Sequence, residues 1–282
     1  MDDLAPSYRL SLTCEPSYHA GLPFLVAVEL ANVSQDEIDL LPFFDLLTFP
    51  SPVSFMLTGV DGEWSWAGRF PRREGEPRGL DFGPGARWPS LVDLSEIHPD
   101  LPPGQYELAA EMRYSSATVV AESCSLEILA LPPSDRERLV RLRSVSEEAS
   151  SWRTFLTDDW RTPDLGGLSE LARQGLAFHA WLHRAAYGPV PIAALDPSGP
   201  TRFDHGILES WATLVRLEIL YAARRPEAEG IEQALLERWP GLAWWVTQVH
   251  AGTGVLKRLR ILYGAESEYA PTDQPLPYQT LR

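Results

Sequence analysis

The sequence predicts a two-domain α+β chain, in which an antiparallel β-sandwich of residues 1–133 precedes an all-α domain of residues 134–282. Three observations support this fold class. Short segments in which apolar and polar residues alternate, separated by turn residues, run from Tyr8 to Leu131 and are typical of a sandwich. The stretch Leu131-Pro132-Pro133-Ser134 interrupts that pattern with prolines and a suitable helix N-cap. Beyond it the apolar period changes from two to about 3.6 residues, which is the period of a helix.

The predicted strands are the segments that alternate or that follow a turn signal. Phe24, Val26, Val28 and Leu30 occupy every second position and would line one face of a strand. The last two strands would form a closing hairpin. The full set of predicted strands is 8–14, 24–30, 53–57, 87–94, 106–114 and 118–129.

Tyr106 makes the prediction more specific. It follows Pro103-Gly104 at the start of a strand, where a tyrosine corner places its hydroxyl on upstream backbone groups and its ring in the core. This feature favours an immunoglobulin-like sandwich.

Two long helices are predicted from apolar side chains at helical spacing. Their apolar lines are Leu168, Leu171, Gly175, Phe178, Leu182, Ala185, and Leu208, Trp211, Val215, Ile219, Ala222. Shorter helices are expected at 135–148, 151–158, 231–239, 240–250 and 255–263, and an extended tail at 269–282. The many tryptophans of this half are expected to fill its core, with a groove as the alternative.

The charge of the chain is concentrated in its first half. The formal net charge is −15, and residues 1–133 hold 7 Arg against 20 Asp and Glu, whereas the remainder holds 17 basic and 19 acidic residues. Because phosphate binding depends on Lys and Arg, no nucleic-acid partner is expected. A field of this sign favours a basic partner or simply solubility.

No targeting or membrane segment is expected. The N-terminal Met1-Asp2-Asp3-Leu4-Ala5-Pro6 is acidic and lacks the basic and apolar regions of a secretory signal, so a cytoplasmic location is expected. The apolar runs fall far short of the roughly 20 residues that a membrane span needs. Cys14 and Cys124 are expected to be reduced thiols on strands.

His179 and His183 are the first candidate metal ligands, because an i, i+4 spacing places two imidazoles on one helix face. Asp204 or His205 would supply a third ligand. The segment lacks the Glu that acts as general base in the zincin motif, and a structural role for both histidines is the main alternative.

Two further patterns point to chemistry only weakly. Gly252-Thr253-Gly254 precedes a basic helix that offers a cradle for a phosphate, although a plain interhelical loop is the simpler interpretation. Asp158 and Asp159, with Asp164 nearby, would supply paired carboxylates for acid–base chemistry. The alternative is that they belong to a turn at the end of a helix. Because no nucleophile motif is present, we expect no catalytic residue and no cofactor.

The run from Asn32-Val33-Ser34 through Gly62-Glu63-Trp64-Ser65-Trp66 and Gly83-Pro84-Gly85 to Pro103-Gly104-Gln105-Tyr106 resembles the intracellular proteinase inhibitor family of bacterial immunoglobulin-like domains. The resemblance covers residues 20–129 and implies a protease as partner. It implies contact through exposed loops of the sandwich, for which the candidate binding residues are Asp61, Trp64, Trp66, Arg69 and Arg72.

Three hypotheses about function remain open. The first is a non-catalytic binding or regulatory protein that recruits or inhibits a protease. The second is a metal-dependent enzyme or ligand-binding protein built on His179 and His183. The third is a structural subunit whose Trp-rich helices form an oligomer interface.

Overall fold

The computed structural model describes residues 7–40, 53–66, 80–96, 101–114, 117–144, 168–187, 190–199, 206–257 and 260. A β-rich N-terminal region is followed by a helical C-terminal region, and the chain divides into two compact units. The first unit holds the strands, α1 (Pro133–Ser144), the start of α3 (Glu170–Tyr187) as far as Leu176, and the start of α4 (Gly206–Ala222) as far as Leu208. The rest of α3 and α4 belongs to the second unit.

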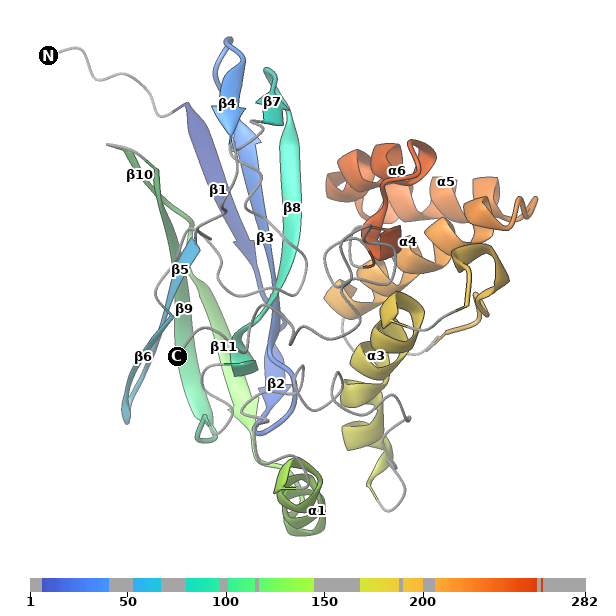
Figure 1. Cartoon of the computed structure of the whole chain (residues 1–282). Coiled ribbons are helices and arrows are strands. Elements are labelled where there is room, and N and C mark those ends of the chain that lie inside the picture. Colours follow the sequence, from blue (N-terminus) through green and yellow to red (C-terminus); the bar gives the residue numbers. More distant parts are fainter. Residues whose placement is uncertain are drawn as a thin grey trace, which may run out of the picture. The chain divides into compact units, whose positions relative to one another are not determined.

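Two sheets form the body of the first unit and appear as two layers in Figure 1. The three-stranded sheet has the order β1 (Tyr8–Thr13), β3 (Leu25–Asn32), β8 (Arg87–Asp93). The six-stranded sheet has the order β2 (Ser17–His19), β11 (Cys124–Leu129), β9 (Gly104–Tyr114), β5 (Val53–Gly59), β6 (Gly62–Trp66), with β10 (Ala117–Val120) also paired to β9. A separate pair joins β4 (Ile38–Leu40) to β7 (Leu80–Phe82).

The strand pairing corrects the sequence prediction in two places. The predicted antiparallel arrangement is wrong for β2, which pairs in parallel with β11. After β1 the chain leaves the three-stranded sheet, contributes β2 to the six-stranded sheet, and returns to the three-stranded sheet in β3. The predicted strand 118–129 is interrupted at 121–123. Val120 lies opposite Glu111 and Cys124 lies opposite Leu108, so three residues face two, and a β-bulge separates β10 from β11.

The facing sides of the two sheets supply the core of the first unit. The Trp66 ring is fully buried, and its Nε1–H donates to the Leu94 carbonyl oxygen at 2.7 Å. Tyr18 on β2 donates its hydroxyl to the carbonyl oxygen of Leu25 on β3, also at 2.7 Å. Buried side chains from both sheets fill the space between, including Val26, Val28, Leu30, Phe55, Leu57, Leu108 and Met112. Each such side chain contributes about 1.5–3 kcal/mol when it is removed from water.

The predicted tyrosine corner is confirmed. The Tyr106 hydroxyl donates to the Pro102 carbonyl oxygen at 2.7 Å, and the ring is buried. A Cβ atom on Gly59 would lie 2.5 Å from the ring, so the tight turn between β5 and β6 needs glycine there. The Trp64 ring packs edge to face with the Tyr106 ring, and the two ring centroids are 5.5 Å apart.

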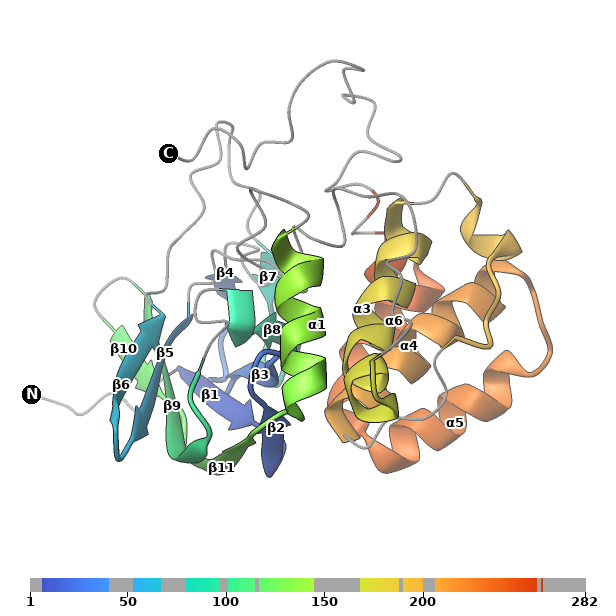
Figure 2. The ribbon, with the colours of Figure 1, turned by 90° about the horizontal axis from the view of Figure 1, so that it is seen from below.

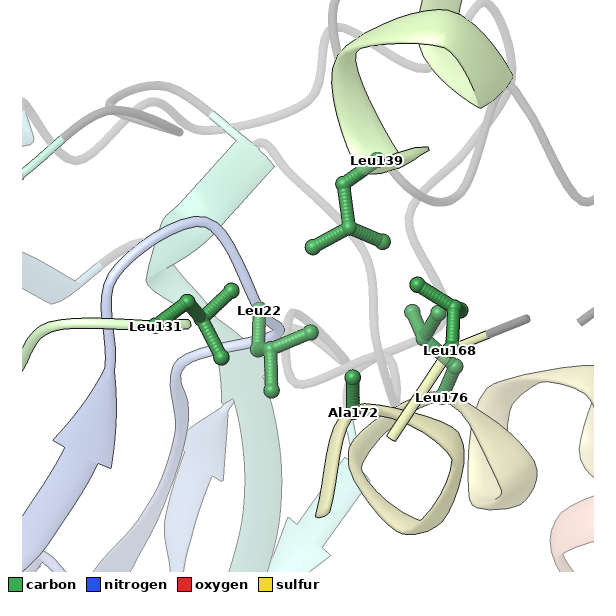
Figure 3. Close-up of a cluster of buried hydrophobic side chains, with 6 residues drawn as sticks. All are labelled: Leu22, Leu131, Leu139, Leu168, Ala172 and Leu176. Carbon is green, nitrogen blue, oxygen red and sulfur yellow. The ribbon is translucent and has the colours of Figure 1, made fainter. Parts of the chain in front are cut away.

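Helical residues complete the first unit. Figure 1 shows α1 below the end of β11, and Figure 2 shows its full length. The Asp135 carboxylate on α1 accepts the backbone N–H of Ser169 at 2.9 Å and also binds the Ser169 hydroxyl, immediately before α3 begins. An apolar cluster joins these elements to the strands (Figure 3): Leu22, Leu131, Leu139, Leu168, Ala172 and Leu176.

The second unit packs α5 (Ala228–Arg238) and α6 (Ala243–His250) with the long helix α4. Three of the tryptophans, Trp181, Trp211 and Trp245, are buried, which confirms the expected core role for them, and the last two meet edge to face at 5.8 Å. The predicted helix 240–250 is a 3-10 turn, Pro240–Leu242, followed by α6. Residues 151–158 and 269–282 lie outside the described residues. None of the helices in the described part of the chain has the length and apolar character that crossing a bilayer requires.

Candidate functional site

The outer face of the six-stranded sheet carries the most extensive polar surface that the register defines. Opposed positions on β5, β6 and β9 place Thr58 beside Glu63 and Glu107, and Ser54 beside Glu111. On β11, Ser125 lies opposite Glu107 and Glu127 lies opposite Gln105. Four carboxylates therefore share this outer face, which we call the acidic sheet face: Glu63, Glu107, Glu111 and Glu127.

The acidic sheet face combines charge with two exposed apolar side chains. Met56 is 44% exposed and Val120 is 64% exposed, and the register places both on it. The register also places Arg113 at its end, opposite Thr118. Since Lys and Arg are otherwise missing from its register positions on β5, β6, β9 and β11, the face presents mainly hydrogen-bond acceptors and negative charge.

Glu107 is the best supported carboxylate of this face. It is exposed, accepts the Ser125 hydroxyl at 2.9 Å, and accepts the Ser123 hydroxyl as well. These two donors, Ser123 first, lower the pKa of Glu107 below its usual value. The carboxylate therefore keeps its charge under mildly acidic conditions.

The candidate binding residues taken from the resemblance differ in their exposure to solvent. Asp61 lies exposed in the turn between β5 and β6, next to Val60, which is 97% exposed. Trp64 is half-buried against Tyr106. Trp66 is fully buried, so its ring serves the core and presents no surface to a partner. Arg69 and Arg72 lie outside the described residues.

The candidate metal ligands are placed only in part. His179 and His183 lie on α3, as predicted, and their side chains are outside what the structure describes. Asp204 and His205 also lie outside the described residues, as do Asp158, Asp159 and Asp164. Among the side chains that the structure does describe, no group of three or more His, Cys, Asp or Glu is arranged to hold a metal ion.

The residues that follow the loop Gly252-Thr253-Gly254 bind an anionic side chain of the same chain. The carboxylate of Glu218 on α4 accepts the backbone N–H groups of Leu256 at 2.8 Å and Lys257 at 2.9 Å. A Cβ atom on Gly254 would lie 2.6 Å from this carboxyl group, so glycine is needed for the close approach. The helix N-terminus that seemed to offer a phosphate cradle is therefore occupied by Glu218 at these two amides.

Glu218 is itself unusual in its environment. Its side chain is 6% exposed, and burial raises its pKa to about 7, against the lowering effect of the backbone donors and of the nearby Arg260 guanidinium. Arg260 is also buried and donates to the carbonyl oxygens of Ala185, at 2.7 Å, and Val190, at 2.6 Å. Arg260 therefore links the end of α3 and Val190 to the segment after residue 254, and Glu218 links α4 to the same segment.

A second polar cluster joins three helices on the surface of the second unit. The Tyr221 hydroxyl donates to a carboxylate oxygen of Glu232, and His250 Nε2 lies 2.9 Å from the same oxygen. The Tyr221 and His250 rings are in contact, with centroids 4.6 Å apart. Burial, and then the Glu232 carboxylate, raise the pKa of Tyr221 to about 12, so the phenol stays protonated and acts as a donor.

The sequence analysis missed both the acidic sheet face and these helical clusters. The face had a signal, because Glu107 and Glu111 alternate with Tyr106, Leu108 and Met112 along one strand. Tyr221, Glu232 and His250 carried none, because they are separated by irregular distances and meet only when three helices pack.

Comparisons with known proteins assign this chain to no family. No protein-family model matches the sequence, and no curated protein sequence matches it. A Pseudomonas fluorescens alkylpurine DNA glycosylase, AlkC, is 11% identical over 45% of this chain and 31% of its own, with a TM-score of 0.27. A Listeria innocua β-glucosidase is 13% identical over 43% of this chain and 16% of its own, with a TM-score of 0.27. The CARDB domain of the Pyrococcus furiosus PF1109 protein is 10% identical over 45% of this chain and 96% of its own, with a TM-score of 0.26.

The first two matches span less than a third of those proteins. At these TM-scores none of the likenesses carries an argument about fold or function. The description of this chain therefore depends on its own residues.

Proposed function

We propose that this chain is a non-catalytic protein-binding or regulatory protein that recognises a basic partner through the acidic sheet face. The observation that carries the proposal is the register, which brings Glu63, Glu107, Glu111 and Glu127 to one side of four paired strands. An exposed sheet face with interspersed hydroxyl groups suits contact with another protein surface better than enclosure of a small molecule.

Charge and apolar contact would contribute differently to binding. The carboxylates would steer a basic partner and set its orientation, while Met56 and Val120 would supply apolar area at the contact. Because exposed charges are screened over about 8 Å at physiological ionic strength, the association rate should fall as salt rises.

The sharpest form of the proposal is that the partner is a protease and that the β-rich unit is an immunoglobulin-like module that binds or inhibits it. The support for this form is the sequence resemblance across residues 20–129 together with the tyrosine corner of Tyr106. In that form Asp61, in the turn between β5 and β6, and the exposed part of Trp64 on β6 would extend the contact beyond the acidic sheet face.

The test uses the full chain as bait in its native lysate, with mass spectrometry of the retained proteins. A triple variant, Glu63→Gln, Glu111→Gln and Glu127→Gln, removes charge from the face while keeping side-chain size. The matched control neutralises three exposed carboxylates of the second unit instead, with Glu227→Gln immediately before α5 and Glu229→Gln and Glu237→Gln on α5.

We expect a basic protein that the wild type and the control retain and that the triple variant loses. Its binding should then be measured with purified components at increasing salt, and a protease partner should also be assayed for inhibition. Equal retention by the wild type and the triple variant would refute the role of the face. A purified partner that binds without any salt dependence would refute it as well.

A further inference from the structure

The two cysteines of the chain, Cys14 and Cys124, meet in the first unit although 109 residues separate them in sequence. Cys14 follows directly after β1 of the three-stranded sheet, and Cys124 is the first residue of β11 in the six-stranded sheet. The Cys124 Sγ donates to the carbonyl oxygen of Leu12, two residues before Cys14, at 3.5 Å. The two thiols are near enough that Cys124 helps to raise the pKa of Cys14. The pair therefore lies where the two sheets come together.

Both thiols are half-buried and neither is in a disulfide. A free cysteine that only fills space has no need of a second thiol as its neighbour. Here the only two cysteines of a 282-residue chain are brought near each other from the end of β1 in one sheet and the start of β11 in the other. A disulfide can form only where the backbone brings two cysteines close together in this way.

We propose that Cys14 and Cys124 are a redox modification site, at which a reversible intramolecular disulfide links the two sheets. The oxidant would be a low-molecular-weight disulfide such as oxidised glutathione. This inference goes beyond the proposed binding function and does not depend on it.

The exchange would proceed in two balanced steps. The Cys124 thiol releases its proton to water, and its sulfur attacks one sulfur of the small disulfide, so that the S–S bond breaks and one thiolate leaves and takes up a proton. Cys14 then loses its proton, its sulfur attacks Cys124 Sγ in the mixed disulfide, and the second small thiol departs. In sum, two protein thiols are oxidised and one small disulfide is reduced to two thiols.

The order of the steps follows from the surroundings of Cys14. Burial, and then the hydrogen bond and charge of Cys124, raise the pKa of the Cys14 thiol to about 12. Very little Cys14 is a thiolate at neutral pH, so Cys14 is a poor attacking group. Once Cys124 is in the mixed disulfide, Cys14 lies near the bond that it must break.

The test treats the folded full chain with oxidised glutathione, counts free thiols and measures the mass. We expect both thiols to be lost, the mass of the chain to fall by about 2 Da, and no disulfide-linked dimer to form. Trypsin cleaves after Arg9, Arg69, Arg113 and Arg136, so the disulfide should link peptide 10–69 to peptide 114–136. Dithiothreitol should restore both thiols, and the oxidised chain should melt at a higher temperature than the reduced chain.

Two single variants separate the roles of the cysteines. Cys14→Ser should trap one glutathione on Cys124, because the second step cannot follow, whereas Cys124→Ser should react far more slowly at neutral pH. A folded wild-type chain that keeps two thiols under conditions that oxidise the urea-unfolded chain would overturn the proposal. A stable mixed disulfide or a disulfide-linked dimer of the wild type would overturn it too.

Discussion

The buried carboxylate of Glu218 should make the folding stability of the chain fall as the pH rises. Burial raises its pKa from 4.5 to about 7 in the folded chain. Between these two values the folded chain holds a proton that the unfolded chain has released, so stability is lost as pH increases through this window. At about 1.4 kcal/mol per pKa unit, the loss is about 3 kcal/mol.

The assay is urea unfolding of the wild type and of Glu218→Gln across this pH range. Glutamine cannot ionise, so the variant should lack this part of the pH dependence. Its single acceptor oxygen can serve the N–H group of either Leu256 or Lys257, and the loss of the other hydrogen bond is a cost that does not depend on pH. The difference in unfolding free energy between the two chains should therefore change by about 3 kcal/mol from the acidic to the neutral end.

Glu209→Gln, on the same helix α4 at a partly exposed ion pair with Arg238, controls for the substitution itself. A difference that stays constant with pH would refute the reasoning. A difference of the opposite sign would show that the backbone donors and Arg260 outweigh burial, and would place the pKa below 4.5.

Three further outcomes are expected. Tyr106→Phe removes the hydrogen bond to the Pro102 carbonyl oxygen and should cost about 1–1.5 kcal/mol in urea unfolding, with no change in the native circular dichroism spectrum. Leu176→Ala leaves a cavity in the apolar cluster of Figure 3 and should cost about 2–5 kcal/mol, and a cost below that of an exposed substitution would contradict its burial. Tyr221→Phe should remove from the ultraviolet titration one phenol that ionises near pH 12, and wild-type stability should fall relative to this variant as pH rises from 10.0 to about 12.

Local patterns predicted the local structure of this chain well. The Pro-Gly-x-Tyr stretch was sufficient for the Tyr106 corner, because the turn, the strand start and the hydrogen-bonded carbonyl all lie within four residues of that tyrosine. The apolar line of α4 gave the position of that helix, with bounds at Gly206 and Ala222. It did not show that α4 is buried on most sides, because only the packing of other helices determines that.

Features that depend on partners far away in sequence were not predictable. The bulge at 121–123 depends on the register with β9, and the three-residue strand β2 depends on a free edge of β11. No local pattern marked Glu218, since its hydrogen-bond partners lie about 38 residues further along the chain. The acidic sheet face similarly required the register of four strands before its carboxylates could be grouped.

The apolar cluster that joins Leu22 and Leu131 to Leu168, Ala172 and Leu176 has a consequence for how the chain is made. Every strand emerges from the ribosome before the side chains of Leu168, Ala172 and Leu176, which cover these leucines. At about 5–20 residues per second, the roughly 45 residues from Leu131 to Leu176 take about 2–9 s to synthesise. During that interval the nascent sheets expose an apolar end to water, which is a surface for chaperones and a point at which incomplete chains can associate.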